Sequence, residues 1–214
     1  MHVSISQTIS IITDSYSRNK LLEDFVALLF IPEYQKATML IGPSDNRYGN
    51  NGKNTYLVLI ESMLGYDNVS HISLQDLEYN RFATAELDGK LANIFADIKR
   101  LELTSTSILK ALISKILLEK KFANPFTLHP KAKLIFSCNE LPEVNDHTDA
   151  WFRRWSIHEF LVKFDGKEDL MKAKRLINNQ DNLDILFTIL INIAHRIKKK
   201  GLLYLDDTNT IREK

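Results

Sequence analysis

The stretch ATMLIGPSDNRYGNNGKNTYLVLIESML, residues 37–64, carries the clearest structural pattern in the chain. It opens with a short apolar run, Ala37 to Ile41, which ends at Gly42-Pro43 as a buried strand does. A polar loop containing glycine follows, and the residues from Thr55 to Leu64 are apolar at helical spacing. A strand, a loop and a helix in this order begin an α/β unit.

The loop between this strand and helix has the composition of a phosphate-binding loop. Gly52 and Lys53 precede the helix, where backbone N–H groups can point at phosphates and a lysine can reach their outer oxygens. The usual spacing is G-x4-G-K-[ST], whereas here nine residues separate Gly42 from Gly52. Two interpretations follow: a phosphate loop with an insertion at residues 45–50, or an ordinary connection between a strand and a helix.

The positions after the lysine bear on metal binding. A Ser or Thr hydroxyl directly after the lysine normally binds Mg²⁺, and this chain has Asn54 followed by Thr55. Asn54 can offer its side-chain carbonyl oxygen, or Thr55 can take the role with its hydroxyl. Both residues are therefore candidate metal ligands.

Two further apolar runs have the character of buried strands. Residues 91–96 lead into Asp97, and residues 132–137 are followed by Asn139. An acid and an amide at the ends of neighbouring strands would lie where open α/β sheets bind ligands. Asp97 and Asn139 are therefore candidate site residues, although each taken alone also suits a turn.

The rest of the chain continues the alternation of strands and helices. Residues 117–128 hold two strand-like pieces around Asn124-Pro125, which indicates a hairpin, and residues 156–164 form a further extended run. The segments with helical spacing are 19–30, 105–116, 168–178 and 183–200. The whole pattern predicts an α/β fold with a central, mainly parallel sheet flanked by helices and a helical C-terminal part.

Composition narrows the class of protein. The 214 residues are 44% hydrophobic and 26% charged, which is ordinary for a globular domain with a real core. A net charge of +1, from 28 basic and 27 acidic residues, excludes a protein that coats nucleic acid by charge alone. The single cysteine, Cys138, excludes an intrachain disulfide and suits a reducing compartment. Without a signal peptide or a long apolar run, we expect no membrane association and a place in the cytoplasm.

Four pieces of the chain, taken in order, resemble the motor domain of superfamily 3 helicases. They are the loop at 42–55, LANIFAD at 91–97, KLIFSCNELP at 133–142 and WFRRW at 151–155, with FATAELDGK at 82–90 adding to the likeness. The most similar branch is the helicase half of primase–helicases from phages, plasmids and large viruses. The resemblance covers about Met39 to Phe164 and implies a P-loop ATPase of the AAA+ type.

The resemblance implies roles for individual residues. Lys53 would bind the ATP phosphates, Asp97 would hold Mg²⁺ or its water and help polarise the attacking water, and Asn139 would sense the γ-phosphate. Arg153 or Arg154 would reach the ATP of an adjacent subunit, which implies a homo-oligomeric ring, usually a hexamer. The implied ATP-binding residues are Gly42, Asn51, Gly52, Lys53, Asn54 and Thr55, and the implied metal ligands are Asn54, Thr55 and Asp97.

The family contacts DNA with a helix and a hairpin that carry basic residues between the acidic strand and the sensor strand. The matching positions here are Lys110 on the helix and Lys115, Lys120, Lys121 and Phe122 in or near the hairpin. Cations attract phosphates and an aromatic ring stacks on bases, so this set suits single-stranded DNA. Many relatives also carry Gly-Asp before the hairpin, which this chain lacks.

These observations predict an ATP-dependent replicative DNA helicase motor of a virus or plasmid, acting in a host cell, with a primase or an origin-binding protein as a further partner. The expected organisation is a helical flank at 1–36, an ATPase core at 37–164 and a helical part at 165–214. The stretched loop, Asn54 and the short hairpin favour an alternative: a divergent P-loop module, weak or inactive in catalysis, that acts as a nucleotide- or DNA-binding assembly factor. A monomeric P-loop phosphotransferase is a further alternative, and WFRRW counts against it.

Overall fold

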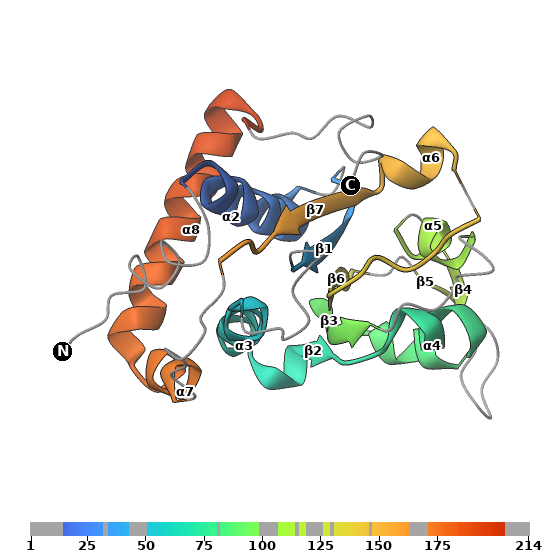
Figure 1. The fold of residues 1–214 in the computed structure, drawn as a ribbon, viewed down its shortest axis with the longest axis horizontal. Coiled ribbons are helices and arrows are strands. Elements are labelled where there is room, and N and C mark those ends of the chain that lie inside the picture. Colours follow the sequence, from blue (N-terminus) through green and yellow to red (C-terminus); the bar gives the residue numbers. More distant parts are fainter. Residues whose placement is uncertain are drawn as a thin grey trace.

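A parallel sheet forms the centre of the molecule (Figure 1). The computed structural model describes residues 15–31, 34–42, 51–80, 82–98, 107–113, 116–118, 126–128, 131–145, 147–162 and 171–203. The five strands of the sheet are β1 (Ala37–Ile41), β2 (Val69–Ser70), β3 (Ala92–Ile98), β6 (Lys133–Cys138) and β7 (Trp155–Glu159). All neighbours pair in parallel, so the predicted α/β fold with a mainly parallel sheet is confirmed.

The order of the strands places the ends of β3, β6 and β1 side by side. The order is β2-β3-β6-β1-β7, so β6 lies between β1 and β3 although it follows both in the chain. In the register, Cys138 at the end of β6 is opposite Ile41 of β1 and Ile98 of β3. Because parallel strands share one carboxyl edge, the carboxyl ends of β1, β3 and β6 meet there.

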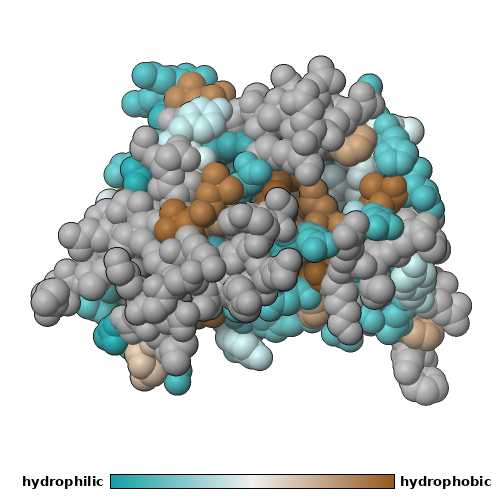
Figure 2. Space-filling view, viewed as in Figure 1, coloured by the Kyte–Doolittle hydropathy of each residue, from teal (hydrophilic) through white to brown (hydrophobic). Residues whose placement is uncertain are grey.

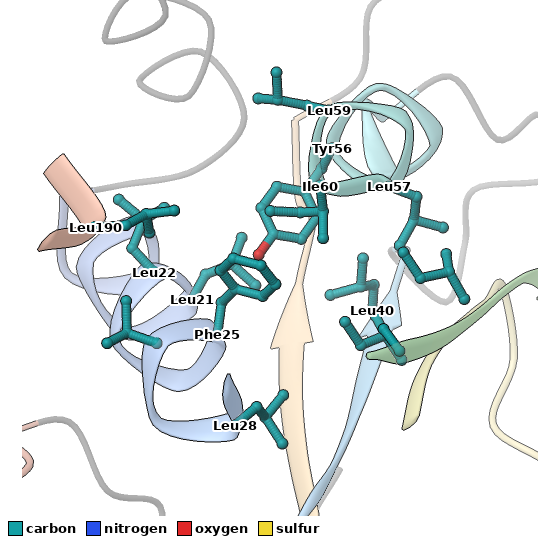
Figure 3. Close-up of a cluster of buried hydrophobic side chains, with 14 of the residues drawn as sticks. Leu21, Leu22, Phe25, Leu28, Leu40, Tyr56, Leu57, Leu59, Ile60 and Leu190 are labelled. Atoms are coloured by element: carbon teal, nitrogen blue, oxygen red, sulfur yellow. The ribbon is translucent and has the colours of Figure 1, made fainter. Parts of the chain in front are cut away.

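One face of the sheet is covered by four helices. They are α2 (Ser15–Phe30), α3 (Lys53–Leu64), α7 (Lys172–Ile177) and α8 (Gln180–Lys200). α2 and α8 lie side by side, and α7 contacts α3 (Figure 1). Figure 3 shows side chains of α2 and α3 meeting beside the sheet, with Tyr56 pointing toward Phe25 and Leu40 of β1 nearby. These buried apolar contacts join the first and last described helices to the sheet.

The opposite face carries shorter elements. They are α4 (Leu74–Tyr79), the 3-10 segment η2 (Ala83–Leu87), α5 (Ser107–Ile113) and α6 (Asp149–Phe152). Alternate strand residues point to this side, including Met39 and Phe136. The ring centroid of Phe136 lies 6.3 Å from that of Trp155, which in turn packs edge-on against Trp151 at 5.3 Å. The segment WFRRW is therefore tied to the core by its tryptophans.

The hairpin predicted within residues 117–128 is confirmed. β4 (Ile116–Leu118) pairs antiparallel with β5 (Phe126–Leu128), and Ile116 is opposite Leu128. The predicted helix over 105–116 was too long, because α5 ends at Ile113. Residue 116 pairs in a strand instead, since an apolar run this short does not distinguish strand from helix by its spacing.

Other element ends also differ from the sequence-based expectation. β3 continues through Asp97 to Ile98, because an irregularity between Phe95 and Ile98 lets the strand resume pairing with β6. The extended run predicted to reach 164 ends as β7 at Glu159. The short elements η1 (Tyr66–Asn68), β2 and α4 were not predicted, since a few residues give no readable period.

A buried polar network fixes α2 to the sheet. The Asp24 carboxylate accepts hydrogen bonds from Tyr34 Oη and from Thr38 Oγ1 of β1 (3.3 Å), and its Oδ2 lies 2.9 Å from Nε2 of His158 on β7. Burial, with the charge of Asp24 as a second cause, raises the pKa of Tyr56. Asp24 and His158 are 3% and 4% exposed, so the network satisfies groups that would be costly to bury unpaired.

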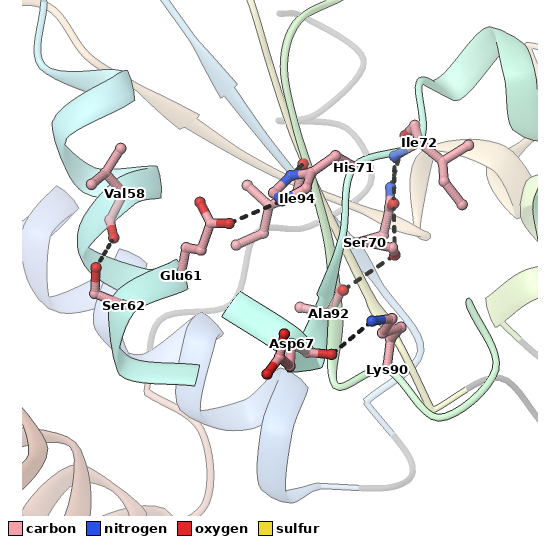
Figure 4. Close-up of polar contacts among 11 residues, drawn as sticks. Val58, Glu61, Ser62, Asp67, Ser70, His71, Ile72, Lys90, Ala92 and Ile94 are labelled. Carbon is pink, nitrogen blue, oxygen red and sulfur yellow. Dashed lines mark hydrogen bonds and ion pairs between the residues drawn. The ribbon is translucent and has the colours of Figure 1, made fainter. Parts of the chain in front are cut away.

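Asn93 on β3 holds the segment after β2 in place. Its amide pairs with both backbone groups of Ile72, at 2.9 Å each, and its Oδ1 accepts from Ser70 Oγ at 3.0 Å. His71 between them binds Glu61 of α3 through Nε2 and the carbonyl of Ile94 through Nδ1, both at 2.9 Å (Figure 4). These contacts hold the short edge strand β2, and the residues that follow it, against β3 and α3.

The described surface is mixed in character. In Figure 2, hydrophilic residues lie mostly toward the periphery of the face and hydrophobic residues nearer its centre. Large apolar side chains with high exposure, such as Tyr66 (73%) and Phe187 (57%), come from different elements and are ordinary when scattered. Among the described helices, none has the length and apolar character needed to cross a membrane.

Candidate functional site

The candidate site lies at the carboxyl edge of β1 and β6. Lys53, the first residue of α3, donates from Nζ to Oδ1 of Asn139, which follows β6, at 2.8 Å. Lys53 is only 4% exposed, while Asn139 is exposed. The loop lysine and the amide proposed to sense phosphate are thus in direct contact, although 86 positions separate them in the chain.

Gly42 leaves room for this contact. A Cβ at position 42 would lie 2.6 Å from Nδ2 of Asn51, 3.0 Å from Nζ of Lys53 and 3.6 Å from Oδ1 of Asn139. The φ of Gly42 is not positive, so the requirement for glycine here is space and not backbone conformation. The side chains of residues 51, 53 and 139 therefore converge above the end of β1.

Gly52 starts helix α3 in the left-handed region, with φ 86° and ψ 0°, which glycine adopts without steric cost. Its carbonyl accepts from the N–H of Tyr56 at 3.1 Å, which closes the first turn. The first N–H groups of α3 have no partners within the helix and can face an anion. Asn54 is exposed and Thr55 half-buried at this end of the helix.

Burial makes Lys53 easier to deprotonate. Removal from water disfavours the ammonium and lowers the pKa of Lys53, an effect that nearby Cys138 and the negative charge of Asp97 only partly oppose. An anionic ligand would favour the charged amine. Burial also raises the pKa of the Cys138 thiol to about 12, and its Sγ packs 3.6 Å from Sδ of Met39. Cys138 is therefore a packing residue.

Asp97 has an unusual backbone conformation. Its φ is 55°, and it is the one residue other than glycine with a positive φ in the described part of the chain. The irregularity of β3 places it there, and its N–H donates to Oγ of Ser137 on β6 at 3.3 Å. Its side chain is exposed at the edge where Lys53 lies. Residues in this region cost energy and occur often at functional sites.

The donor set of this edge suits a hard divalent cation. Asp97 offers a carboxylate, Asn54 an amide oxygen and Thr55 a hydroxyl, all of which are oxygen ligands of the kind that Mg²⁺ prefers. The described residues contain no group of three or more His, Cys, Asp or Glu side chains able to hold a metal. A cation here would therefore depend on phosphate oxygens and water for most of its ligands.

The two arginines lie at the opposite edge of the sheet. The N–H of Ala37, at the start of β1, donates to the carbonyl of Arg154 at 2.7 Å, and Ala37 is opposite Trp155 in the register. The chain from Ala37 to Gly42 spans about 16 Å at roughly 3.3 Å per residue. Neither arginine can join the Lys53 site of its own chain at that separation without leaving its place.

The two arginine side chains differ. Arg154 is half-buried and donates from Nη1 to the carbonyl of Ala150, so it braces the end of α6. Arg153 is exposed, and its side chain forms no hydrogen bond or ion pair with the residues that the structure describes. Of the pair, Arg153 is the one available to another molecule.

The candidate DNA-contacting residues are only partly described. Lys110 lies on α5 as expected and is half-buried. Lys115, Lys120, Lys121 and Phe122 fall outside the described residues. Ser137 and the Asp24–His158 pair were not predicted from the sequence. Ser137 appears there only as a hydroxyl at the end of an apolar run, and Asp24 and His158 are distant from each other in the chain.

Comparison with known proteins gives the fold and the family. The chain is similar to the C-terminal region of NrS-1 in its A form apo structure, with a TM-score of 0.67 and 15% identity, over 97% of this chain and 50% of that one. It is also similar to JCV helicase bound to a thiazolopyridine compound, with a TM-score of 0.54 and 15% identity, over 92% of this chain and 60% of the helicase. At this identity the likeness shows a shared fold, and the chain spans about half the length of the NrS-1 region.

No curated protein matches the sequence. The sequence profile of one family, described as a family of unknown function (DUF5906), matches residues 47–154. This range runs from the loop before Lys53 to Arg154, includes Asp97 and Asn139, and covers just over half of the chain. The chain therefore belongs to the DUF5906 family.

Proposed function

We propose that this chain is the ATP-hydrolysing motor of a replicative DNA helicase of a virus or plasmid. The observation that carries the proposal is the contact of Lys53 with Asn139 above Gly42, beside Asp97, at the carboxyl edge of a parallel sheet. A cation, an amide and an acid around one point are what phosphoryl transfer requires, because it depends on placed charges and dipoles. The fold shared with a helicase supports this proposal.

In this proposal Lys53 binds the outer phosphates and Asn139 contacts the γ-phosphate. Mg²⁺ would be held by Asp97 together with Asn54 or Thr55, and when bound it would neutralise the charge that develops on the phosphate oxygens. Asp97, exposed at the edge, orients and polarises the attacking water. A phosphate beside Lys53 would favour the protonated, positively charged amine, which burial alone disfavours.

The opposite positions of site and arginine favour catalysis between subunits. Arg153 is exposed at the amino edge of the sheet, so it can serve the site of a neighbouring copy and not its own. A head-to-tail arrangement of copies closes as a ring, for which we propose a homohexamer. Arg154 would keep the segment that carries Arg153 in place through its contact with Ala150. Lys110 and the hairpin, including Lys115, Lys120, Lys121 and Phe122, would grip single-stranded DNA.

The proposal extends to the setting of the chain. We assign a helical flank to residues 1–36, the ATPase core to 37–164 and a helical part to 165–214. A primase or an origin-binding protein would load the motor in the cytoplasm of the host cell. Because the matched NrS-1 region is about twice as long, such functions can belong to other parts of a larger assembly.

The test is steady-state ATP hydrolysis with and without single-stranded DNA, for the wild type and for Lys53→Ala. We expect turnover that DNA stimulates and that the variant lacks, with both proteins equally folded by circular dichroism. Turnover that persists in Lys53→Ala would contradict the assignment of the site.

A second function is favoured by Asn54, which replaces the usual hydroxyl. In that case the chain is a nucleotide- or DNA-binding assembly factor without useful hydrolysis. Wild-type protein that binds ATP through Lys53 but does not hydrolyse it, even as an assembled ring on DNA, would support this alternative. A third alternative, a phosphotransferase, would act as a monomer and would not respond to DNA.

A further inference from the structure

The side chain of Asn51 is buried without a partner for its donor. It is 3% exposed, and its Nδ2 has no hydrogen-bond partner within the part of the chain that the structure describes. A buried amide whose N–H donor forms no hydrogen bond destabilises the fold, so native proteins rarely retain one without a reason. The free donor therefore points to a ligand.

The direction of the amide identifies where that ligand lies. Nδ2 of Asn51 and Nζ of Lys53 both lie beside the backbone of Gly42, 2.6 and 3.0 Å from the position that a Cβ there would take, so the two nitrogens are neighbours at the end of β1. Two donors at one place, with the positive charge of the lysine behind them, favour an anionic oxygen.

Asn139 adds a third donor. A lysine amine can only donate, so the atom of Asn139 that faces Nζ at 2.8 Å must be the carbonyl oxygen. Its Nδ2 is therefore left to donate elsewhere. The three donors come from three separate segments: the residue before Gly52, the start of α3 and the residue after β6.

We propose that the Asn51 amide binds the terminal phosphate of a nucleoside triphosphate and so determines the specificity of the site for triphosphate over diphosphate. A terminal phosphate has three non-bridging oxygens for three donors, whereas an interior phosphate has two. This inference rests on the proposed function and adds to it a residue that distinguishes substrate from product.

The experiment measures the binding of a non-hydrolysable ATP analogue and of ADP by calorimetry, to wild type, Asn51→Leu, Lys53→Ala and a control. Leucine has a similar size and no donor, and Asn192→Leu on the exposed side of α8 is the matched control. We expect Asn51→Leu to weaken analogue binding about tenfold or more, the worth of a hydrogen bond to a charged group, while ADP binding changes less than about threefold. Its melting temperature without nucleotide should stay the same or rise, since Nδ2 of Asn51 has no partner among the residues that the structure describes.

The other outcomes count against the inference. An unchanged affinity, or an equal loss for the analogue and ADP, would show that Asn51 does not read the terminal phosphate. Asn51→Asp keeps the shape and replaces the donor with an acceptor; if both variants unfold while the control does not, the amide is structural. If the wild type shows no Lys53-dependent nucleotide binding, the proposed function itself fails, and this is seen before Asn51 is considered.

Discussion

Asp97 allows stability and catalysis to be separated by substitution. Its φ of 55° lies in the left-handed region, where an ordinary residue costs roughly 1–2 kcal/mol. Asparagine tolerates this region as aspartate does, and glycine adopts it freely but loses about 0.5–1 kcal/mol through the flexibility of the unfolded chain. Because the side chain of Asp97 is exposed, removal of its charge should contribute little to the free energy of unfolding.

Three variants then have different expected stabilities. Asp97→Asn should unfold at the wild-type free energy, Asp97→Gly within about 0.5 kcal/mol of it, and Asp97→Ala about 1 kcal/mol lower. All three remove the acid that we propose to hold the metal and orient water. Each should therefore lose at least ~100-fold in turnover, since a metal supplies several kcal/mol to such reactions.

The assays are urea unfolding followed by circular dichroism and steady-state ATP hydrolysis on single-stranded DNA. The N–H of residue 97 bonds to Ser137 through the backbone, so none of the changes removes that contact directly. Wild-type turnover in Asp97→Asn would refute the catalytic role. Equal stabilities of Asp97→Ala and Asp97→Asn would refute the argument that residue 97 stores backbone strain.

Three further predictions follow from the site. Gly42→Ala should weaken nucleotide binding about tenfold, because the added methyl group would press on Asn51 and Lys53. The control is Gly89→Ala, at φ 76° with open space around it, which should lower the free energy of unfolding by about 1 kcal/mol and leave binding unchanged. Equal binding by both variants would contradict the steric argument. Arg154→Ala should lower the melting temperature because it removes the contact with Ala150. Arg153→Ala, at an exposed position, should instead abolish the turnover of the assembled protein. Mixing Arg153→Ala with Lys53→Ala should restore part of that turnover. Nucleotide binding should weaken as the pH rises toward 10.5, because burial lowers the pKa of Lys53 below that usual value and the amine loses its charge. Calorimetry in buffers of different ionisation enthalpy should show proton uptake on binding. Binding without proton uptake across this range would exclude Lys53 as the cause of the pH dependence.

The strands next to the site could be predicted because each is a short apolar run that ends at a glycine or a polar residue. β1, β6 and most of β3 follow that pattern, and the hairpin is visible from Asn124-Pro125 between its two apolar pieces. The positive φ of Asp97 could not be predicted, because it results from the irregular pairing of β3 with β6. The contact between Asp24 and His158 could not be predicted for a similar reason. Each is an ordinary polar residue in the sequence, and only the packing of α2 against β7 buries them together.

The strand order explains why Lys53 and Asn139 meet. A sequence with alternating strands and helices would equally allow a sheet in chain order, in which β2 would stand beside β1 and both β3 and β6 would be further away. In that arrangement β2 would separate β1 from β3, and neither Asp97 nor Asn139 would lie on a strand next to the one that leads to the lysine. With β6 inserted, the lysine is held by a neutral amide oxygen at 2.8 Å, and Asp97 is displaced to the next strand, where its charge reaches the lysine without a direct bond. With a neutral amide as its direct partner, the lysine remains available to an anion and the acid to a cation, which is the separation that binding of a metal and a phosphate side by side requires.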